Sequence, residues 1–157
     1  MKHSNLHFFY LICIVLTTLS SSCDRKSNQT IPNVYVSFTI NILTDPEFIR
    51  LQAQGNSIAI TNITLGLQTL GYNNNGVIVY NAGGYEYYAF DCTCPFDYPS
   101  SIKVLSDGDG IATCPQCKSR YVLQSSGMPS TAGPATIPLK EYKAIYNPNT
   151  GELWVYN

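Results

Sequence analysis

The sequence predicts an all-β fold, an antiparallel β sandwich or small barrel, on three observations. Apolar and polar residues alternate strictly from Val34 to Ile42, which is typical of a strand with one buried face. Eleven glycines and nine prolines, with few charged side chains, suit a small domain with many turns. Two turn-rich segments, 106–110 and 147–151, each separate two short apolar runs and are typical of hairpins.

The other elements follow in chain order. Thr44 and Pro46 provide a cap and a first-turn proline, and they predict a short helix over 46–54 that ends at Gly55. Further strands are expected at 57–63, 76–81, 85–90, 103–105, 111–113, 120–124, 142–146 and 152–156. No internal repeat interrupts this order. The sequence therefore predicts one β domain with two cysteine-bearing loops projecting from it.

The first 22 residues are typical of a processing segment. Lys2 gives a positive start, residues 6–19 are almost wholly apolar, and three serines precede Cys23. This order resembles a bacterial lipoprotein signal, although Leu19 lies four places before the cysteine, one more than is usual. The resemblance implies an exported chain held to a bacterial membrane by lipid on Cys23. A tether (23–30) and the β domain (31–157) would follow, and ordinary cleavage that leaves a free Cys23 thiol is the alternative.

The charged and histidine residues exclude several classes of function. Nine basic and ten acidic residues include no basic run, so a nucleic-acid partner is not expected. Both histidines, His3 and His7, lie in the predicted signal. The domain therefore lacks the histidine that Ser–His or Cys–His catalysis and many metal sites need. An electron carrier or a binding domain is expected rather than an enzyme.

The chemistry of the sequence is concentrated in two cysteine pairs. Cys92 and Cys94 form the first pair, Cys114 and Cys117 form the second, and the hairpin over 103–113 separates them. Four thiolates at one centre can bind zinc tetrahedrally or hold an iron–sulfur cluster. In an exported protein, two disulfides between the pairs would staple the same loops without a metal.

The segments around these pairs resemble a known family. YAFDCTCP (88–95), CPQCKSRY (114–121) and the glycine–proline segment at 133–139 resemble parts of a Rieske [2Fe-2S] domain. The family pattern is C-x-H followed by C-x-x-H, with the cysteines on one iron and the histidines on the other. The resemblance covers about half of the chain. It implies a β fold with two cluster-binding loops, and electron transfer with a redox partner that the sequence does not name.

The pattern fits best when Cys94 is taken as the first ligand, which leaves seventeen residues between the two ligand motifs. Cys94 and Cys114 then match the cysteine ligands, while Phe96 and Cys117 stand in the histidine places. Phe96 cannot bind a metal. Cys92 lies two residues before Cys94, on the same face of an extended segment, and is the expected fourth member of the centre.

Ser119 and Tyr121 match two further positions of the resemblance. It implies that their hydroxyls donate hydrogen bonds to cluster and cysteine sulfurs and raise the reduction potential. Without a cluster they are a turn residue and a strand residue. Two interpretations stay open at this point: a [2Fe-2S] centre that four cysteines hold for electron transfer, or a structural or binding domain stapled by one zinc ion or by disulfides.

Overall fold

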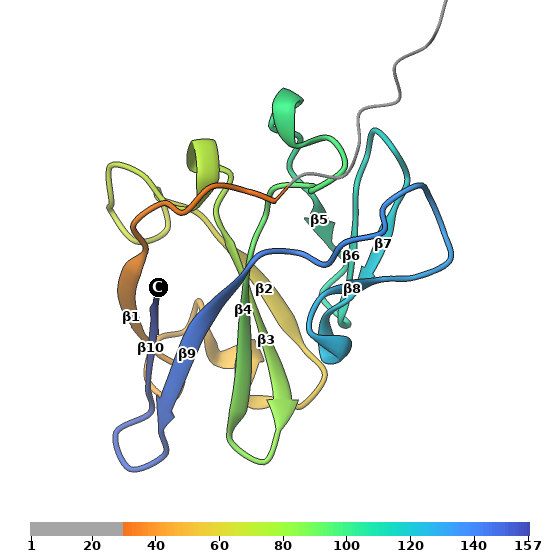
Figure 1. Cartoon of the computed structure of the whole chain (residues 1–157). Coiled ribbons are helices and arrows are strands. Elements are labelled where there is room, and N and C mark those ends of the chain that lie inside the picture. The colour runs from red at the N-terminus through yellow and green to blue at the C-terminus, as the bar shows by residue number, and fades with distance from the viewer. Residues whose placement is uncertain (1–29) are drawn as a thin grey trace, which may run out of the picture.

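The computed structural model describes residues 30–157; the predicted signal, Cys23 and most of the predicted tether lie outside this range. Within it the regular structure is strand or single 3₁₀ turn, which confirms the predicted all-β fold (Figure 1). The strands are β1 (Ser37–Asn41), β2 (Ser57–Ile60), β3 (Val77–Gly83), β4 (Glu86–Asp91), β5 (Leu105–Ser106), β6 (Ile111–Thr113), β7 (Arg120–Val122), β8 (Met128–Pro129), β9 (Glu141–Asn147) and β10 (Glu152–Tyr156). The 3₁₀ turns are η1 (Ile49–Gln52), η2 (Tyr72–Asn74), η3 (Tyr98–Ser100) and η4 (Leu123–Ser125).

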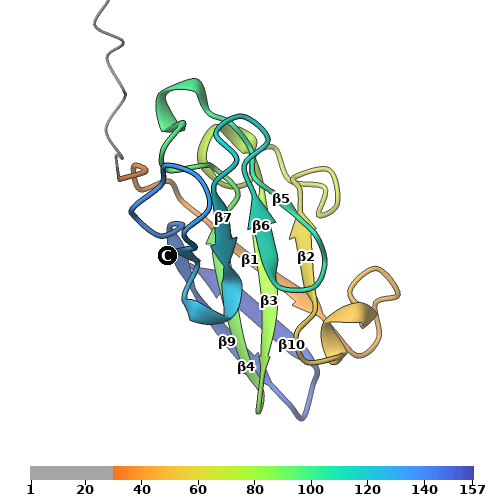
Figure 2. The ribbon, with the colours of Figure 1, turned by 90° about the vertical axis from the view of Figure 1, so that its right-hand side faces the viewer.

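The strands form two antiparallel sheets. The larger sheet has the order β1-β10-β9-β4-β3-β2, and the smaller one the order β5-β6-β7-β8. Figure 2 shows the smaller sheet in front of β3 and β4. These two central strands therefore lie between two apolar layers.

The larger sheet curls around a first apolar core. Phe38 and Ile40 of β1 point inward and pair with Val155 and Leu153 of β10, and all four side chains are buried. The strand predicted from the alternation over 34–42 is thus confirmed, although the regular strand covers only Ser37–Asn41. One buried face for each of these strands follows from the period of two.

A second apolar core fills the space between the two sheets. Val77 and Val79 of β3 belong to the first core, whereas Ile78 and Tyr80 of the same strand belong to the second. Burial on both faces explains why β3 is a continuous apolar run rather than an alternating one. The second core also contains the cysteine-bearing loops, so it positions the candidate site.

The helix predicted over 46–54 is wrong. The segment forms turns and the single 3₁₀ turn η1, in which the N–H of Leu51 donates to the carbonyl of Phe48 at 2.9 Å. These two side chains are the buried ones, and their spacing of three matches a 3₁₀ repeat rather than an α-helical one. A segment this short also forms few backbone hydrogen bonds as an α helix, and such a helix needs a longer apolar face packed on the core to be stable.

Both predicted hairpins are present. β5 pairs with β6, and the turn is closed because the Asp107 carboxylate accepts the N–H groups of Asp109 and Ile111. β9 pairs with β10 from Asn147↔Glu152 onward. Among the described residues, none of the helical segments is long and apolar enough to cross a bilayer.

Candidate metal centre

The first loop of the site continues directly from β4. Thr93 forms a β-bridge with Lys103, and the N–H of Cys94 donates to the carbonyl of Ile102 at 2.8 Å. The chain is thus held extended through the first cysteine pair before it turns at η3. This backbone pairing fixes where the Cys94 side chain enters the second core.

The second loop is the tight turn between β6 and β7. The N–H of Cys114 donates to the carbonyl of Ser119 at 2.9 Å, and the N–H of Lys118 donates to the carbonyl of Cys114 at 3.1 Å. Lys118 has a positive φ of 63°, which lets the chain reverse within this short turn. Cys117 is therefore presented beside Cys114 on the same side of the turn.

Four side chains from these loops converge on one point: Cys94, Asp97, Cys114 and Cys117. Their ligand atoms all lie within 4.8 Å of one another. The sulfurs of Cys94 and Cys117 are 3.6 Å apart, and the sulfur of Cys114 is 3.1 Å from Oδ2 of Asp97. Cys117 is partly exposed and the other three are buried. In this structure all four cysteines of the described chain are free thiols.

The two loops present their ligands in the same way. Cys94-Pro-Phe-Asp97 and Cys114-Pro-Gln-Cys117 share one pattern of ligand, proline, any residue and ligand. In each loop the N–H of the last ligand donates to the sulfur of the first and lowers its pKa. Paired ligands a few residues apart on two loops are typical of tetrahedral zinc sites.

Hydrogen bonds and burial shift the pKa values of the three cysteines in different directions. The pKa of Cys94 falls to about 6, chiefly because the Cys114 thiol donates to its sulfur, and Tyr121 adds a second donor. The same bond raises the pKa of Cys114, and burial raises it further. Burial is also the main cause that raises the pKa of Cys117. Of the three thiols, Cys94 is thus the one whose ionised form its surroundings favour most.

The hydroxyls of Ser119 and Tyr121 lie beside two of the cysteine sulfurs. Oη of Tyr121 is 3.2 Å from the sulfur of Cys94, and Oγ of Ser119 is 3.2 Å from the sulfur of Cys117. Ser119 also accepts the N–H of Ala135 at 3.0 Å, which ties the glycine–proline segment to the site. Gly133 has a φ of 82°, and a Cβ there would lie 2.4 Å from Cα of Ser119. Only glycine allows this close approach.

The structure does not bring Cys92 into the group, and Asp97 takes the fourth place. Cys92 is fully buried in the second core, and this burial raises its pKa to about 12. Cys92 and Cys94 belong to the same core. However, the Cα atoms of residues two apart in an extended chain are about 6.6 Å apart, so the Cys92 sulfur lies outside the group. Phe96, which stands in a histidine place of the resemblance, packs against that core.

The group of four fits one metal ion. Sulfurs bound to a single tetrahedral zinc at about 2.3 Å lie about 3.8 Å apart. The observed 3.6 Å between the sulfurs of Cys94 and Cys117 is close to that value. In the Rieske resemblance these two positions belong to different irons, and the separation of the irons would hold the two ligands further apart. The residues thus fit a single-ion site of three sulfurs and one carboxylate oxygen better than a two-iron cluster.

Asp97 is the site residue that sequence reasoning missed. A signal for it was present, because the spacing Cys94-x-x-Asp97 repeats the spacing Cys114-x-x-Cys117. The resemblance instead placed a ligand position at residue 96 and implied a ligand set made of cysteines alone. A search for two loops of equal ligand spacing, with carboxylates allowed, would have found it.

No family model and no curated protein matches the sequence. Among solved structures, the chain is similar to a putative NADH-dependent nitrite reductase small subunit from Mycobacterium tuberculosis. The identity is 16% and the TM-score is 0.43, over 80% of this chain and 97% of that one. Similarity at this level transfers neither the activity of that subunit nor any residue role to this chain.

Proposed function

We propose that this protein is a metal-binding β domain whose Cys94, Asp97, Cys114 and Cys117 hold a single zinc ion. The convergence of four ligand atoms within 4.8 Å of one another carries the proposal. Three thiolates and one carboxylate are all zinc ligands, and four protein ligands leave no open position for a substrate. A closed site of this kind has a structural role, so zinc would hold the two loops together under the smaller sheet.

The experiment is metal analysis of purified protein together with a thiol count. The proposal expects about one equivalent of zinc, no colour and four reduced thiols in the folded domain. Replacement of zinc by Co²⁺ should give the intense visible bands of a tetrahedral thiolate site. A metal-free protein with its thiols oxidised in pairs would contradict the proposal and support a disulfide-stapled domain.

A second function, electron transfer through an iron–sulfur centre, is favoured by one observation. The hydroxyls of Tyr121 and Ser119 lie at hydrogen-bond distance from two ligand sulfurs, and such donors tune reduction potentials. If iron and sulfide occupy the site, the protein is coloured and dithionite bleaches it reversibly. Tyr121→Phe should then lower the reduction potential, because one hydrogen bond that stabilises negative charge on sulfur is lost.

We also propose that the chain is exported and anchored by lipid on Cys23. The polar residues after Cys23 and the serines before it support this proposal. Cys23→Ser should move the protein from the membrane fraction to the soluble fraction without a change in its metal content. A variant that remains in the membrane fraction would show that another segment anchors the chain.

A further inference from the structure

The strands β4 and β9 pair over only a short stretch and then part. Their register is restricted to Ala89↔Tyr142 and Phe90↔Glu141, although both strands continue beyond this point. The β3–β4 and β9–β10 hairpins therefore extend as two separate arms (Figure 1). Between the arms lies a groove of about 740 Å³, within the range of small-molecule sites, which is about 300–1,000 Å³. It shares no lining residue with the metal centre.

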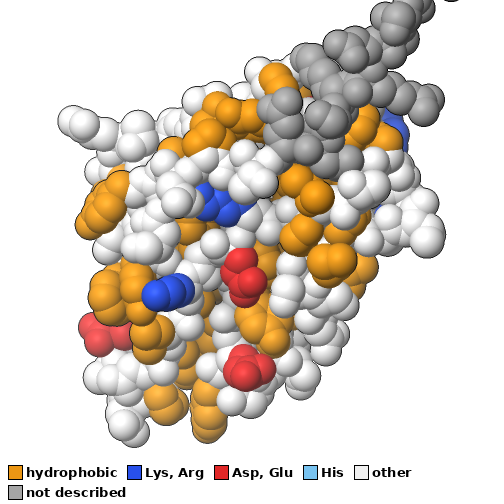
Figure 3. Space-filling view, viewed as in Figure 1, with side chains coloured by type: hydrophobic (Ala, Val, Ile, Leu, Met, Phe, Trp, Pro, Cys, Tyr) orange, Lys and Arg blue, Asp and Glu red, His pale blue; other side chains and the backbone are white. Residues whose placement is uncertain are grey.

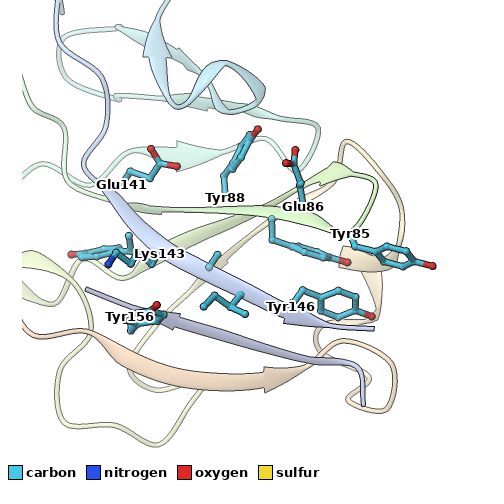
Figure 4. A pocket seen from close by; sticks show the side chains of 11 residues that line it. Tyr85, Glu86, Tyr88, Glu141, Lys143, Tyr146 and Tyr156 are labelled. Atoms are coloured by element: carbon cyan, nitrogen blue, oxygen red, sulfur yellow. The ribbon is translucent and has the colours of Figure 1, made fainter. Parts of the chain in front are cut away.

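Tyrosines line this groove from both arms. The rings of Tyr85 and Tyr146 stack at one end, with centroids 6.1 Å apart and planes 21° apart, and Figure 4 shows them side by side. Tyr156 lines the other end, beside Lys143. Tyr85 is 72% exposed and most of its surface is free for contact. Tyr146 also packs against the first core, so the free aromatic surface of the groove comes mainly from Tyr85.

Charged side chains of both signs stand among these rings. Glu86 and Glu141 line the groove on either side of Tyr88, and Lys143 lies over the ring of Tyr156 at 5.6 Å. In the described chain neither carboxylate has a hydrogen-bond or ion-pair partner. Figure 3 shows acidic and basic side chains set among hydrophobic ones over β4, β9 and β10. The groove therefore presents free acceptors and a donor beside apolar surface.

We propose that this groove binds a neutral oligosaccharide. Both signs of charge are present, so neither an anion nor a cation is matched throughout. Hydroxyl groups donate to carboxylates and accept from an ammonium group, so a polyhydroxylated ligand satisfies Glu86, Glu141 and Lys143 alike. The flat, apolar C–H face of a sugar ring packs on an exposed tyrosine ring. A chain of such rings matches an elongated groove with tyrosines at both ends.

The single tryptophan of the protein is a built-in reporter for the groove. Trp154 stacks on Tyr156, with centroids 4.1 Å apart and planes 19° apart, and Tyr156 lines the groove. A ligand on Tyr156 changes the surroundings of Trp154. The test is a fluorescence titration of the purified full chain with neutral hexasaccharides of four kinds: β-1,4-glucose, α-1,4-glucose, β-1,4-mannose and β-1,4-xylose.

The expected result is a saturable fluorescence change with at least one of the four sugars. Tyr85→Asn and Glu141→Gln should each weaken that binding at least tenfold; Asn tolerates the positive φ of 67° at position 85. Tyr35→Asn is the matched control, because Tyr35 is 86% exposed and lies outside the groove, and it should bind like the parent chain. Circular dichroism shows whether each variant is folded.

Three outcomes would overturn the proposal. The first is no saturable change with any of the four sugars. The second is unaltered affinity in folded Tyr85→Asn and Glu141→Gln variants, which would put the sugar elsewhere on the surface. The third is saturable binding of a proline-rich peptide instead of any sugar, because aromatic-lined grooves also accept such peptides.

Discussion

The carboxylate of Asp97 is oriented from both sides before any metal binds. Its Oδ2 lies 3.1 Å from the sulfur of Cys114, and its Oδ1 accepts the side-chain amide of Gln116 at 3.3 Å. Gln116 is not one of the four candidate ligands, and an outer partner of this kind fixes the direction of a ligand atom. The fold thus fixes the orientation of the Asp97 carboxylate within the group of four.

Exchange of this carboxylate for an amide tests the ligand set directly. Asp97→Asn keeps the shape but removes the charge, so we expect zinc affinity to fall at least tenfold in a competition titration with a chromogenic chelator. Cys92→Ser is the matched control and should retain one equivalent, because the structure places Cys92 outside the group. Loss of zinc in Cys92→Ser, with retention in Asp97→Asn, would restore the all-cysteine site expected from the sequence.

A second prediction concerns Gly133, whose backbone lies against Ser119. Gly133→Ala adds a Cβ at 2.4 Å from Cα of Ser119 in a left-handed conformation. We expect the free energy of unfolding to fall by more than about 2 kcal/mol, with weaker metal retention, because Ser119 would be displaced. Gly66→Ala is the control: its φ is 65° but nothing lies within 4 Å, so a loss of about 1 kcal/mol is expected. Equal losses in urea titrations would contradict the close approach.

Much of the site was predictable from the sequence, and the reason for the remainder is physical. Cys94, Cys114 and Cys117 stood out because close cysteine pairs beside turns have few other uses. Asp97 did not, because acidic residues are common on surfaces and nothing in the sequence shows that this one is buried. The place of Cys92 depends on the rise of the extended chain, which period-two alternation alone does not reveal.

Among the secondary-structure elements, β4 and β9 are joined by a buried side-chain hydrogen bond as well as by their backbone pairing. Oη of Tyr142 in β9 donates to Oδ2 of Asp91, the last residue of β4, at 2.7 Å. The same carboxylate accepts the N–H groups of Tyr72 and Thr93 at 2.7 and 2.8 Å. Asp91 is fully buried, so these bonds replace the water it loses on folding. They join the end of β4 to β9 and to the first cysteine loop.

Removal of the Tyr142 hydroxyl should therefore lower the free energy of unfolding more than removal of an exposed hydroxyl does. Tyr142→Phe leaves the buried Asp91 carboxylate short of one donor, and we expect about 1–3 kcal/mol of destabilisation in urea unfolding. Tyr35→Phe changes an exposed ring by the same atom and should leave stability unaltered. If both variants unfold at the same urea concentration, the bond contributes nothing net to folding.

The elements themselves were predicted unevenly. Strands with strong alternation or a marked turn, such as Ser37–Asn41 and the β9–β10 hairpin, follow from local sequence. The two-residue strand β8 and the 3₁₀ turns do not, because so few residues carry no periodicity. The division of β3 between two cores is likewise set by the second sheet that covers it, a contact between residues distant in sequence.

On the scale of the whole molecule, the two sheets differ in how they are stabilised. The six-stranded sheet encloses its own apolar core, whereas the smaller sheet has strands of only two or three residues. Strands this short do not persist alone. The smaller sheet therefore depends on the second core and on the group of Cys94, Asp97, Cys114 and Cys117, which brings its β6–β7 turn together with the loop after β4.

Metal removal should consequently affect one part of the molecule. After chelation we expect faster hydrogen–deuterium exchange across 105–129 and the loop at 92–103, while β1, β9 and β10 keep their protection. Peptide-resolved mass spectrometry with and without a chelator measures this difference. A uniform increase over both sheets would mean that the domain unfolds as one unit, and no increase would mean that the metal adds nothing to stability.

The 3.6 Å between the sulfurs of Cys94 and Cys117 has a consequence for the metal-free protein. Two sulfurs so close are a short movement from the S–S bond length of about 2.05 Å. When Cys94 is a thiolate and Cys117 a thiol, an oxidant accepts two electrons from the pair and one proton is released. The Cys94 thiolate is the form that attacks other disulfides. In an oxidising compartment, the rate of metal binding would thus compete with the rate of disulfide formation between Cys94 and Cys117. The faster of the two reactions would decide whether a new chain holds a metal or a disulfide.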